Sequence, residues 1–157
     1  MFDKLTPCLW FDGKAEEAAK FYVSIFPNSK ITKTAYYSEA GPMKAGTVLI
    51  VSFELDGVPF TALNGGPHYK FNEAVSFQIP CKTQKDVDYY WDKLTAGGSE
   101  IQCGWRKDKY GLAWQVVPVK LMELNAHGEP ARLVRMNQAM FKMTKLEIAA
   151  LERAYNG

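Results

Sequence analysis

Two side chains in the sequence have the type and surroundings for acid–base chemistry. His68 follows an expected strand in the segment NGGPHYKF, beside Asn64 and two flexible glycines. An imidazole titrates near neutral pH and can act as a general base or hydrogen-bond a ligand. Glu54 shares one face of an expected strand with Ser52, so its carboxylate is the second candidate acid or base. Each has a plainer alternative: a linker histidine bonded to local backbone, and a glutamate at the wet end of its strand.

The cysteines are the remaining reactive groups. Cys8, Cys81 and Cys103 are widely spaced and form no Cys-x-x-Cys pattern. The spacing therefore indicates neither a disulfide framework nor a thiolate metal site. We expect free thiols that are mostly buried.

Length and charge limit the function classes. A chain of 157 residues fits one domain, residues 1–157, with a sizeable core. Its 19 basic and 17 acidic residues leave a net charge of +2 and are scattered, so nucleic acid is not an expected partner. No apolar run approaches the roughly 20 residues that span a bilayer, so no membrane partner is expected. The start of the chain does not resemble a signal peptide, so a cytoplasmic location is expected.

The first half of the chain reads as one strand, one helix and three strands. The apolar residues Ala18, Phe21, Tyr22 and Ile25 recur at helical spacing and predict a helix over 14–26. Short β-like runs predict the strands. Their ranges are 5–11, 30–37, 46–55 and 58–64, which places unit one at about 3–66.

The second half begins the same order again. Strands are expected at 74–81, 100–106 and 111–118, with no obvious fourth strand and a helix between the first two. Thr83 is a plausible N-cap for that helix. Its apolar residues, Val87, Tyr90, Trp91 and Leu94, each lie 69 positions after those of the first helix. This internal repeat defines unit two, at about 73–119.

A helical tail follows over about 120–157. Pro130 can open a helix that runs to Met143, and Thr144 with Glu147 forms a possible capping box ahead of a last helix. Its leucines and methionines can pack on the body of the protein or on a second subunit.

Two strand–helix–strand–strand–strand units in tandem resemble the vicinal-oxygen-chelate superfamily, which includes glyoxalases and bleomycin-resistance proteins. The segment DKYGLAWQVV is similar to the signature Asp-x-x-Gly-x-x-aromatic-Glu, with Asp108, Gly111 and Trp114 in place. The segments WFDGKAEEAAKFYVSIFPNSKI and ALNGGPHYKF resemble the PhnB-like branch, often labelled 3-demethylubiquinone-9 3-methyltransferase-like. The resemblance implies an α+β fold in which tandem βαβββ units form a half-open mixed β-sheet barrel, here with C-terminal helices.

Metal-using members of that superfamily take four His or Glu ligands from the first and last strands of the two units. The matching positions in this chain are Pro7, Thr61, Ser76 and Gln115. None of these residues carries an imidazole, thiolate or carboxylate, the groups that hold a catalytic ion. Because this chain departs from the superfamily at these four positions, we expect no metal and no cofactor.

Strand alternation extends this set to a predicted ligand cavity. If the four positions face the cavity, residues two places away face it as well, whereas Trp10 and Trp114 face the covering helices. Trp105 on the closing hairpin can cover the cavity mouth or cap the core. The candidate ligand-contacting residues are Leu9, Phe11, Ser52, Thr61, Leu63, Asn64, His68, Ser76, Gln78, Trp105 and Gln115.

Three functions stay open at this point. The leading hypothesis is a metal-independent protein that binds a small molecule. The second is an enzyme, either a metal-dependent lyase or isomerase with other ligands, or a metal-free one that uses His68 or Glu54. The third is methyl transfer, as the family label implies, although neither 65–67 nor 97–98 forms a glycine-rich turn between a parallel strand and a helix. The superfamily also implies a homodimer.

Overall fold

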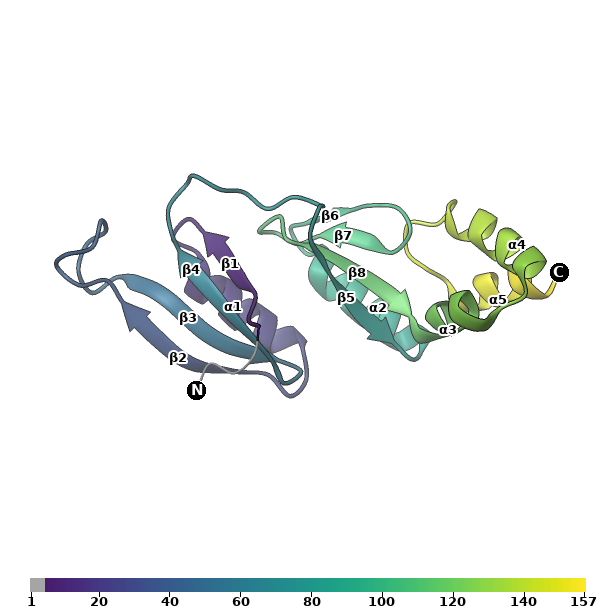
Figure 1. The fold of residues 1–157 in the computed structure, drawn as a ribbon, viewed down its shortest axis with the longest axis horizontal. Helices are drawn as coiled ribbons and strands as arrows, with labels where there is room; N and C mark the ends of the chain where they lie inside the picture. Colours follow the sequence, from purple (N-terminus) through teal and green to yellow (C-terminus); the bar gives the residue numbers. More distant parts are fainter. Residues whose placement is uncertain (1–4) are drawn as a thin grey trace. The chain divides into compact units, whose positions relative to one another are not determined.

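The computed structural model describes residues 5–157. The chain divides into two compact units, one that ends at Lys70 and one that runs from Phe71 to Gly157 (Figure 1). The expected unit boundaries at 3–66 and 73–119 stay predictions, and residues 3 and 4 lie outside the described part of the chain. The expected tail at 120–157 belongs to the second unit. That the two units form a single domain stays a prediction.

The first unit is an open four-stranded mixed sheet with one helix. The strand order is β1-β4-β3-β2, and β1 is parallel to β4 whereas the other pairs are antiparallel (Figure 1). Its elements are β1 Cys8–Phe11, α1 Ala15–Ile25, β2 Lys30–Tyr36, β3 Val48–Leu55 and β4 Val58–Asn64.

The second unit repeats this topology with the order β5-β8-β7-β6, and β5 is parallel to β8. It has four strands rather than the expected three, because the expected strand at 100–106 is broken. Cys103 and Gly104 have φ of 61° and 79°, which turns the chain between β6 and β7. The elements are β5 Ser76–Cys81, α2 Gln84–Thr95, β6 Ser99–Glu100, β7 Trp105–Lys107, β8 Ala113–Pro118, α3 Val119–His127, α4 Pro130–Met140 and α5 Ile148–Asn156.

In the first unit, α1 covers one face of the sheet with aromatic packing. The Tyr22 and Phe53 rings stack with centroids 6.3 Å apart, and Phe53 stacks on Phe60 at 5.6 Å. All three side chains are buried. Burying side chains of this size stabilises the fold by about 1.5–3 kcal/mol each, so this face is the core of the unit.

In the second unit, α2 covers the corresponding face and begins with a capping box. The Thr83 hydroxyl accepts a hydrogen bond from the Asp86 N–H at 3.2 Å, and the Asp86 carboxylate accepts one from the Thr83 N–H at 2.8 Å. These hydrogen bonds lower the pKa of Asp86 below its usual range. The prediction of Thr83 as the N-cap is confirmed.

The three tail helices pack around a small apolar cluster of their own. Its buried members are Leu121, Met136, Leu146 and Leu151. Pro130 stands in the first turn of α4, as expected, although the helix ends at Met140 and not at residue 143.

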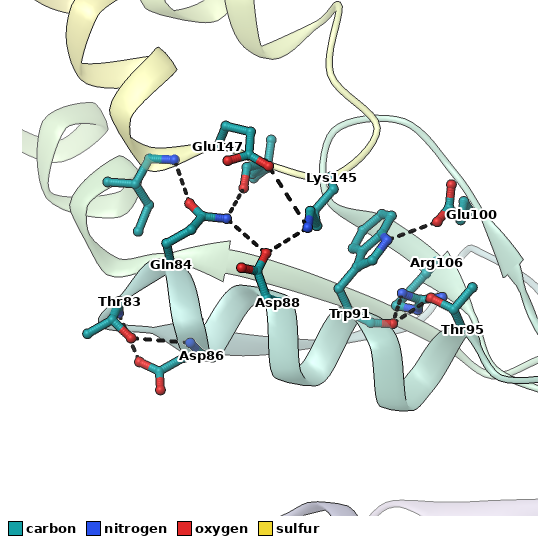
Figure 2. Close-up of polar contacts among 12 residues, drawn as sticks. Thr83, Gln84, Asp86, Asp88, Trp91, Thr95, Glu100, Arg106, Lys145 and Glu147 are labelled. Atoms are coloured by element: carbon teal, nitrogen blue, oxygen red, sulfur yellow. Dashed lines mark hydrogen bonds and ion pairs between the residues drawn. The ribbon is translucent and has the colours of Figure 1, made fainter.

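The beginning of α5 differs from the prediction. Glu147 is the N-cap and makes no side-chain cap hydrogen bond, so the expected capping box of Thr144 and Glu147 is wrong. The Ile148 N–H instead donates to the Gln84 side-chain oxygen at 2.9 Å. Lys145 donates to Asp88 at 2.7 Å, which lowers the pKa of Asp88 and raises that of Lys145 (Figure 2). A residue of α2, distant in sequence, therefore supplies the cap that local residues do not.

Within residues 5–157, no helix has both the length and the apolar character required to cross a membrane.

Candidate functional site

The face of each sheet opposite its helix is called here the open face of that unit. In the first unit, Thr61 on β4 is paired with Cys8 on β1 and with Ser52 on β3. Side chains of paired residues point to the same side of a sheet, so these three form one row across the open face. Trp10 and Leu63 form the next row.

Leu9 and Phe11 lie on the opposite, helix-covered face. They are only 5% and 4% exposed and are paired with Ala62 and Asn64. The predictions that Leu9 and Phe11 share a face with Thr61, and that Trp10 faces the helix, are therefore wrong.

The error comes from one residue in a connection. The offset of 69 holds for the helices, but three residues join β1 to α1 and only two join β5 to α2. The strands are therefore related by an offset of 70, as the strand ends Phe11 and Cys81 show. Because side-chain direction alternates along a strand, a shift of one residue reverses every side chain. Cys8, not Pro7, stands in line with Thr61.

Asn64 is committed to the fold. It is 8% exposed, and its side-chain oxygen accepts a hydrogen bond from the Ala15 N–H at 2.9 Å, at the beginning of α1. Its amide nitrogen donates to the Val48 carbonyl oxygen, also at 2.9 Å. The residue expected to contact ligand thus caps a helix from 49 positions away.

The open face of the second unit agrees with the prediction. Ser76 and Gln78 on β5 share a face with Gln115 on β8, and Trp105 on β7 is paired directly with Gln115. The Gln115 amide nitrogen donates to the Ser76 hydroxyl at 2.8 Å, and that of Gln78 donates to the Gln115 oxygen at 3.4 Å. We call Ser76, Gln78 and Gln115 together the amide row. Trp114 faces the helix side, as predicted, and is 2% exposed.

The two acid–base candidates, His68 and Glu54, both belong to the first unit. His68 is exposed in the loop after β4. Glu54 forms an ion pair with Lys30 at 3.5 Å, in the row of the first sheet that also holds Pro59. Catalytic roles for His68 and Glu54 stay predictions.

The signature hairpin has a structural role. Asp108 is 3% exposed, and one of its carboxylate oxygens accepts from the N–H groups of Tyr110 and Leu112 at 2.8 and 3.1 Å. The other oxygen accepts from the Trp114 indole at 2.9 Å. Gly111 takes the φ of 86° that the turn requires. The signature residues hold the turn before β8 and fix Trp114 in the core.

Sequence reasoning missed a groove of about 580 Å³ on the second unit. The Trp91 indole donates to Glu100 at 2.9 Å on its wall (Figure 2). The groove was not predictable because part of its lining comes from the folded-back tail. The lining residues are Trp91, Asp92, Thr95, Ala96, Glu100, Thr144 and Lys145.

Arg106 is the unusual buried group of this unit. Its side chain is 0% exposed, and the guanidinium carbon lies 4.5 Å from the centre of the Trp91 ring. One guanidinium nitrogen donates to the Trp91 carbonyl oxygen, whereas Nε and Nη2 have no partner among the described residues. Burial lowers the pKa of Arg106 to about 10.

The open faces do not fit a tightly bound metal ion. Their polar side chains near the superfamily's ligand positions are one thiol, hydroxyls and amides: Cys8, Ser52, Thr61, Ser76, Gln78 and Gln115. Of these groups, the Cys8 thiol is one that zinc sites use, but the neutral hydroxyls and amides lack the charge or donor strength to complete a zinc, magnesium or calcium site. In residues 5–157, no three or more His, Cys, Asp or Glu side chains gather in a metal-binding arrangement.

Tandem βαβββ units with this strand order and hairpin define the vicinal-oxygen-chelate superfamily. The structure is similar to the PhnB protein of Bacillus cereus, at 35% identity and a TM-score of 0.66, over 74% of this chain and 99% of that one. The chain belongs to the 3-demethylubiquinone-9 3-methyltransferase family, whose pattern matches residues 3–117.

Two more distant structures share the fold. Protein PA1353 from Pseudomonas aeruginosa is 18% identical with a TM-score of 0.60, over 73% of this chain and 96% of that one. The fosfomycin resistance protein FosX from Listeria monocytogenes is 13% identical with a TM-score of 0.50, over 73% and 91%. No curated protein sequence shows significant similarity. The family match ends at residue 117, and α3 begins at Val119, so the tail helices lie beyond it.

Proposed function

We propose that the protein binds a small, uncharged organic molecule without a metal ion, through the open faces of its sheets. The observation that carries the proposal is the chemistry of the amide row and its surroundings. Ser76, Gln78 and Gln115 present neutral donors and acceptors beside the indole of Trp105. Apolar surface with a few directed polar groups is typical of small-molecule sites.

The open face of the first unit supports the same reading. Cys8, Ser52 and Thr61 offer a thiol and two hydroxyl groups in one row, and Trp10 lies in the next. Neutral hydrogen-bonding groups cost less to desolvate than charges when a ligand covers them. A ligand with carbonyl, hydroxyl or amide groups therefore suits these faces better than an ion does.

The fold of each unit leaves these side chains available. The helix-covered faces are filled mainly by buried aromatic and aliphatic residues, and the buried side chains of Asn64 and Asp108 there are bonded within the fold. Ser76, Gln78 and Gln115 bond to one another across the surface of a strand pair. A ligand can replace or extend such bonds without breaking the core.

The test is a screen of small uncharged organic molecules at millimolar concentration by protein-observed NMR. Shifts of the side-chain amide signals of Gln78 and Gln115 are expected, and Gln115→Leu should lose them. The matched control is Gln138→Leu, because Gln138 is exposed on α4. Absence of any shift on either open face would contradict binding. About one tightly held divalent ion per chain in protein prepared without chelators would overturn metal independence.

Methyl transfer is the second candidate because the family description names a methyltransferase. Titration calorimetry with S-adenosylmethionine tests it. The first proposal requires no heat of binding, and a clear one-to-one isotherm would replace it with methyl transfer.

We also propose a cytoplasmic homodimer, in keeping with the superfamily. Exposed apolar side chains such as Tyr36 and Val58 on the first unit are surfaces that a second copy could cover. Sedimentation equilibrium should give twice the 17.7 kDa mass of the chain. A mass of one chain at micromolar concentration would contradict the dimer.

A further inference from the structure

Trp105 differs from the other tryptophans in how its indole N–H is used. The indole N–H groups of Trp10, Trp91 and Trp114 donate to Gly66, Glu100 and Asp108, at 2.8, 2.9 and 2.9 Å. That of Trp105 has no acceptor in the described part of the chain, and the side chain is half-buried on the open face of the second unit. The fold's hydrogen bonds therefore hold three indoles, and the fourth keeps a free donor beside its aromatic plane.

The amide row next to Trp105 also keeps unused groups. Because Gln78 donates to Gln115 and Gln115 donates to Ser76, the Gln78 carbonyl oxygen and the Ser76 hydroxyl hydrogen are left at the two ends. Each glutamine amide nitrogen also retains a second hydrogen. The Gln78 amide thus offers an unused acceptor and an unused donor on one group, in the pairing that a cyclic amide presents.

Charge on this face is balanced internally. Lys107 shares the face and forms an ion pair with Glu73 at 2.5 Å. This contact lowers the pKa of Glu73 below its usual range, so the carboxylate stays ionised beside the lysine at neutral pH. A ligand on the amide row therefore needs no charge of its own.

We infer that the open face of the second unit selects a planar ring that carries a lactam, a ring carbonyl next to a ring N–H. The ring lies against the indole of Trp105, and the lactam exchanges hydrogen bonds with Gln78 and Gln115. This inference rests on the proposed function and names the ligand class for the same face. Stacking on an indole requires a flat ring, and an amide row pairs best with another amide.

Three probes of nearly equal size separate the two requirements. 2-Pyridone has the flat ring and the lactam, 2-piperidone keeps the lactam but loses the flat ring, and pyridine keeps the flat ring but loses the lactam. Binding is measured on the full chain by the NMR signals of the Trp105 indole N–H and the Gln78 and Gln115 side-chain amides. 2-Pyridone should bind about tenfold more tightly than either partner compound.

Variants locate the contact. Trp105→Leu should weaken 2-pyridone binding about tenfold and leave 2-piperidone binding unchanged, because only the flat ring uses the indole. Gln115→Met should weaken both lactams and leave pyridine unchanged. Gln138→Leu, at an exposed position of α4 away from the open faces, is the control and should change neither, and backbone amide spectra establish that each variant is folded.

The outcomes separate this inference from the proposed function. Equal binding of the three probes, or 2-pyridone binding that survives Trp105→Leu, overturns the inference and leaves a less selective small-molecule site. If neither the probes nor any other small molecule shifts the open-face signals, both fail together. Tenfold selectivity that is lost in Trp105→Leu supports the inference.

Discussion

The two units place three large side chains at the same points of the helix-covered face, but with different chemistry. The first unit stacks Tyr22, Phe53 and Phe60. The second has Trp91, Arg106 and Trp114 at the corresponding positions, because Phe53 is paired with Phe60 as Arg106 is with Trp114. Arg106 therefore occupies the position that Phe53 has in the first unit. The helix residue that packs on it is Trp91, where the first unit has Tyr22.

The difference shows that the topology does not depend on an all-apolar centre. A flat guanidinium fills the space of a ring and is attracted to the tryptophan face, at 4.5 Å. Burying a charge with two unpartnered nitrogens is costly, and the lowered pKa of Arg106 reflects this. The shared strand order is retained despite that cost, since it depends on strand pairing and on the apolar side of the helix.

The helix caps differ in the same way. α2 is capped by its immediate neighbours Thr83 and Asp86, whereas α1 is capped by Asn64 on the last strand of its unit. The first cap requires only local sequence. The second exists only after β4 has paired with β1, so it connects the helix to the completed sheet.

The largest expected effect comes from the aromatic centre of the first unit. Phe53→Ala should lower the free energy of unfolding by about 3–5 kcal/mol, because a buried ring leaves a cavity under Tyr22 and Phe60. Urea unfolding monitored by circular dichroism measures the change. A loss below about 1 kcal/mol would show that this centre is not the core of the unit.

The corresponding change in the second unit should have the opposite sign. Arg106→Met removes the buried charge and retains most of the volume, so the free energy of unfolding should rise by about 1–3 kcal/mol. The same unfolding experiment applies. A loss of more than about 1 kcal/mol would mean that the contact with Trp91 outweighs the cost of burial.

Removing the two helix caps should lower the free energy of unfolding by different amounts, and the difference should be smaller than that between the two centres. Asn64→Ala leaves the Ala15 N–H and the Val48 carbonyl without partners, and should cost about 2–3 kcal/mol. Thr83→Ala removes a single exposed cap bond and should cost about 1 kcal/mol. Equal losses in thermal unfolding would remove the distinction between the long-range and the local cap.

The smallest effect is expected at the contact between α2 and the tail. The lowered pKa of Asp88 means that its stabilising contribution is present above the unfolded pKa of about 3.9 and is lost as pH falls through the lower folded value. Because both side chains are partly exposed, Asp88→Asn should cost only a few tenths of a kcal/mol at pH 7. Wild type and variant should then converge near pH 2, and a difference that persists there would be due to something other than the carboxylate charge.

Features that depend on neighbouring residues could be predicted from the sequence. Helical spacing located both helices and most of their buried residues, and the cap at Thr83 and the strand at 58–64 were found where expected. Alternation along the second unit's strands correctly placed Ser76, Gln78 and Gln115 on one face. Each of these depends on a periodicity that a few adjacent residues establish.

Features that depend on distant contacts could not be predicted. Leu9 and Phe11 were placed on the wrong face because the position of Pro7 was counted back from the first helix, and the connection before α1 has one residue more than the connection before α2. Asn64 was predicted to contact ligand because the residues near it in the sequence do not indicate its hydrogen bond with the Ala15 N–H. The groove beside Trp91 requires the tail to fold back, which no local pattern encodes.

The tail has a practical consequence for any shortened version of the protein. A chain cut at the end of the family match would lose Leu121, Leu146 and the backbone N–H that Gln84 accepts from. The second unit would then expose apolar surface to water, and the Gln84 side-chain oxygen would lose its hydrogen-bond donor. Exposed apolar surface of this kind promotes aggregation. The C-terminal helices are best regarded as a cover that the second unit needs for its own stability.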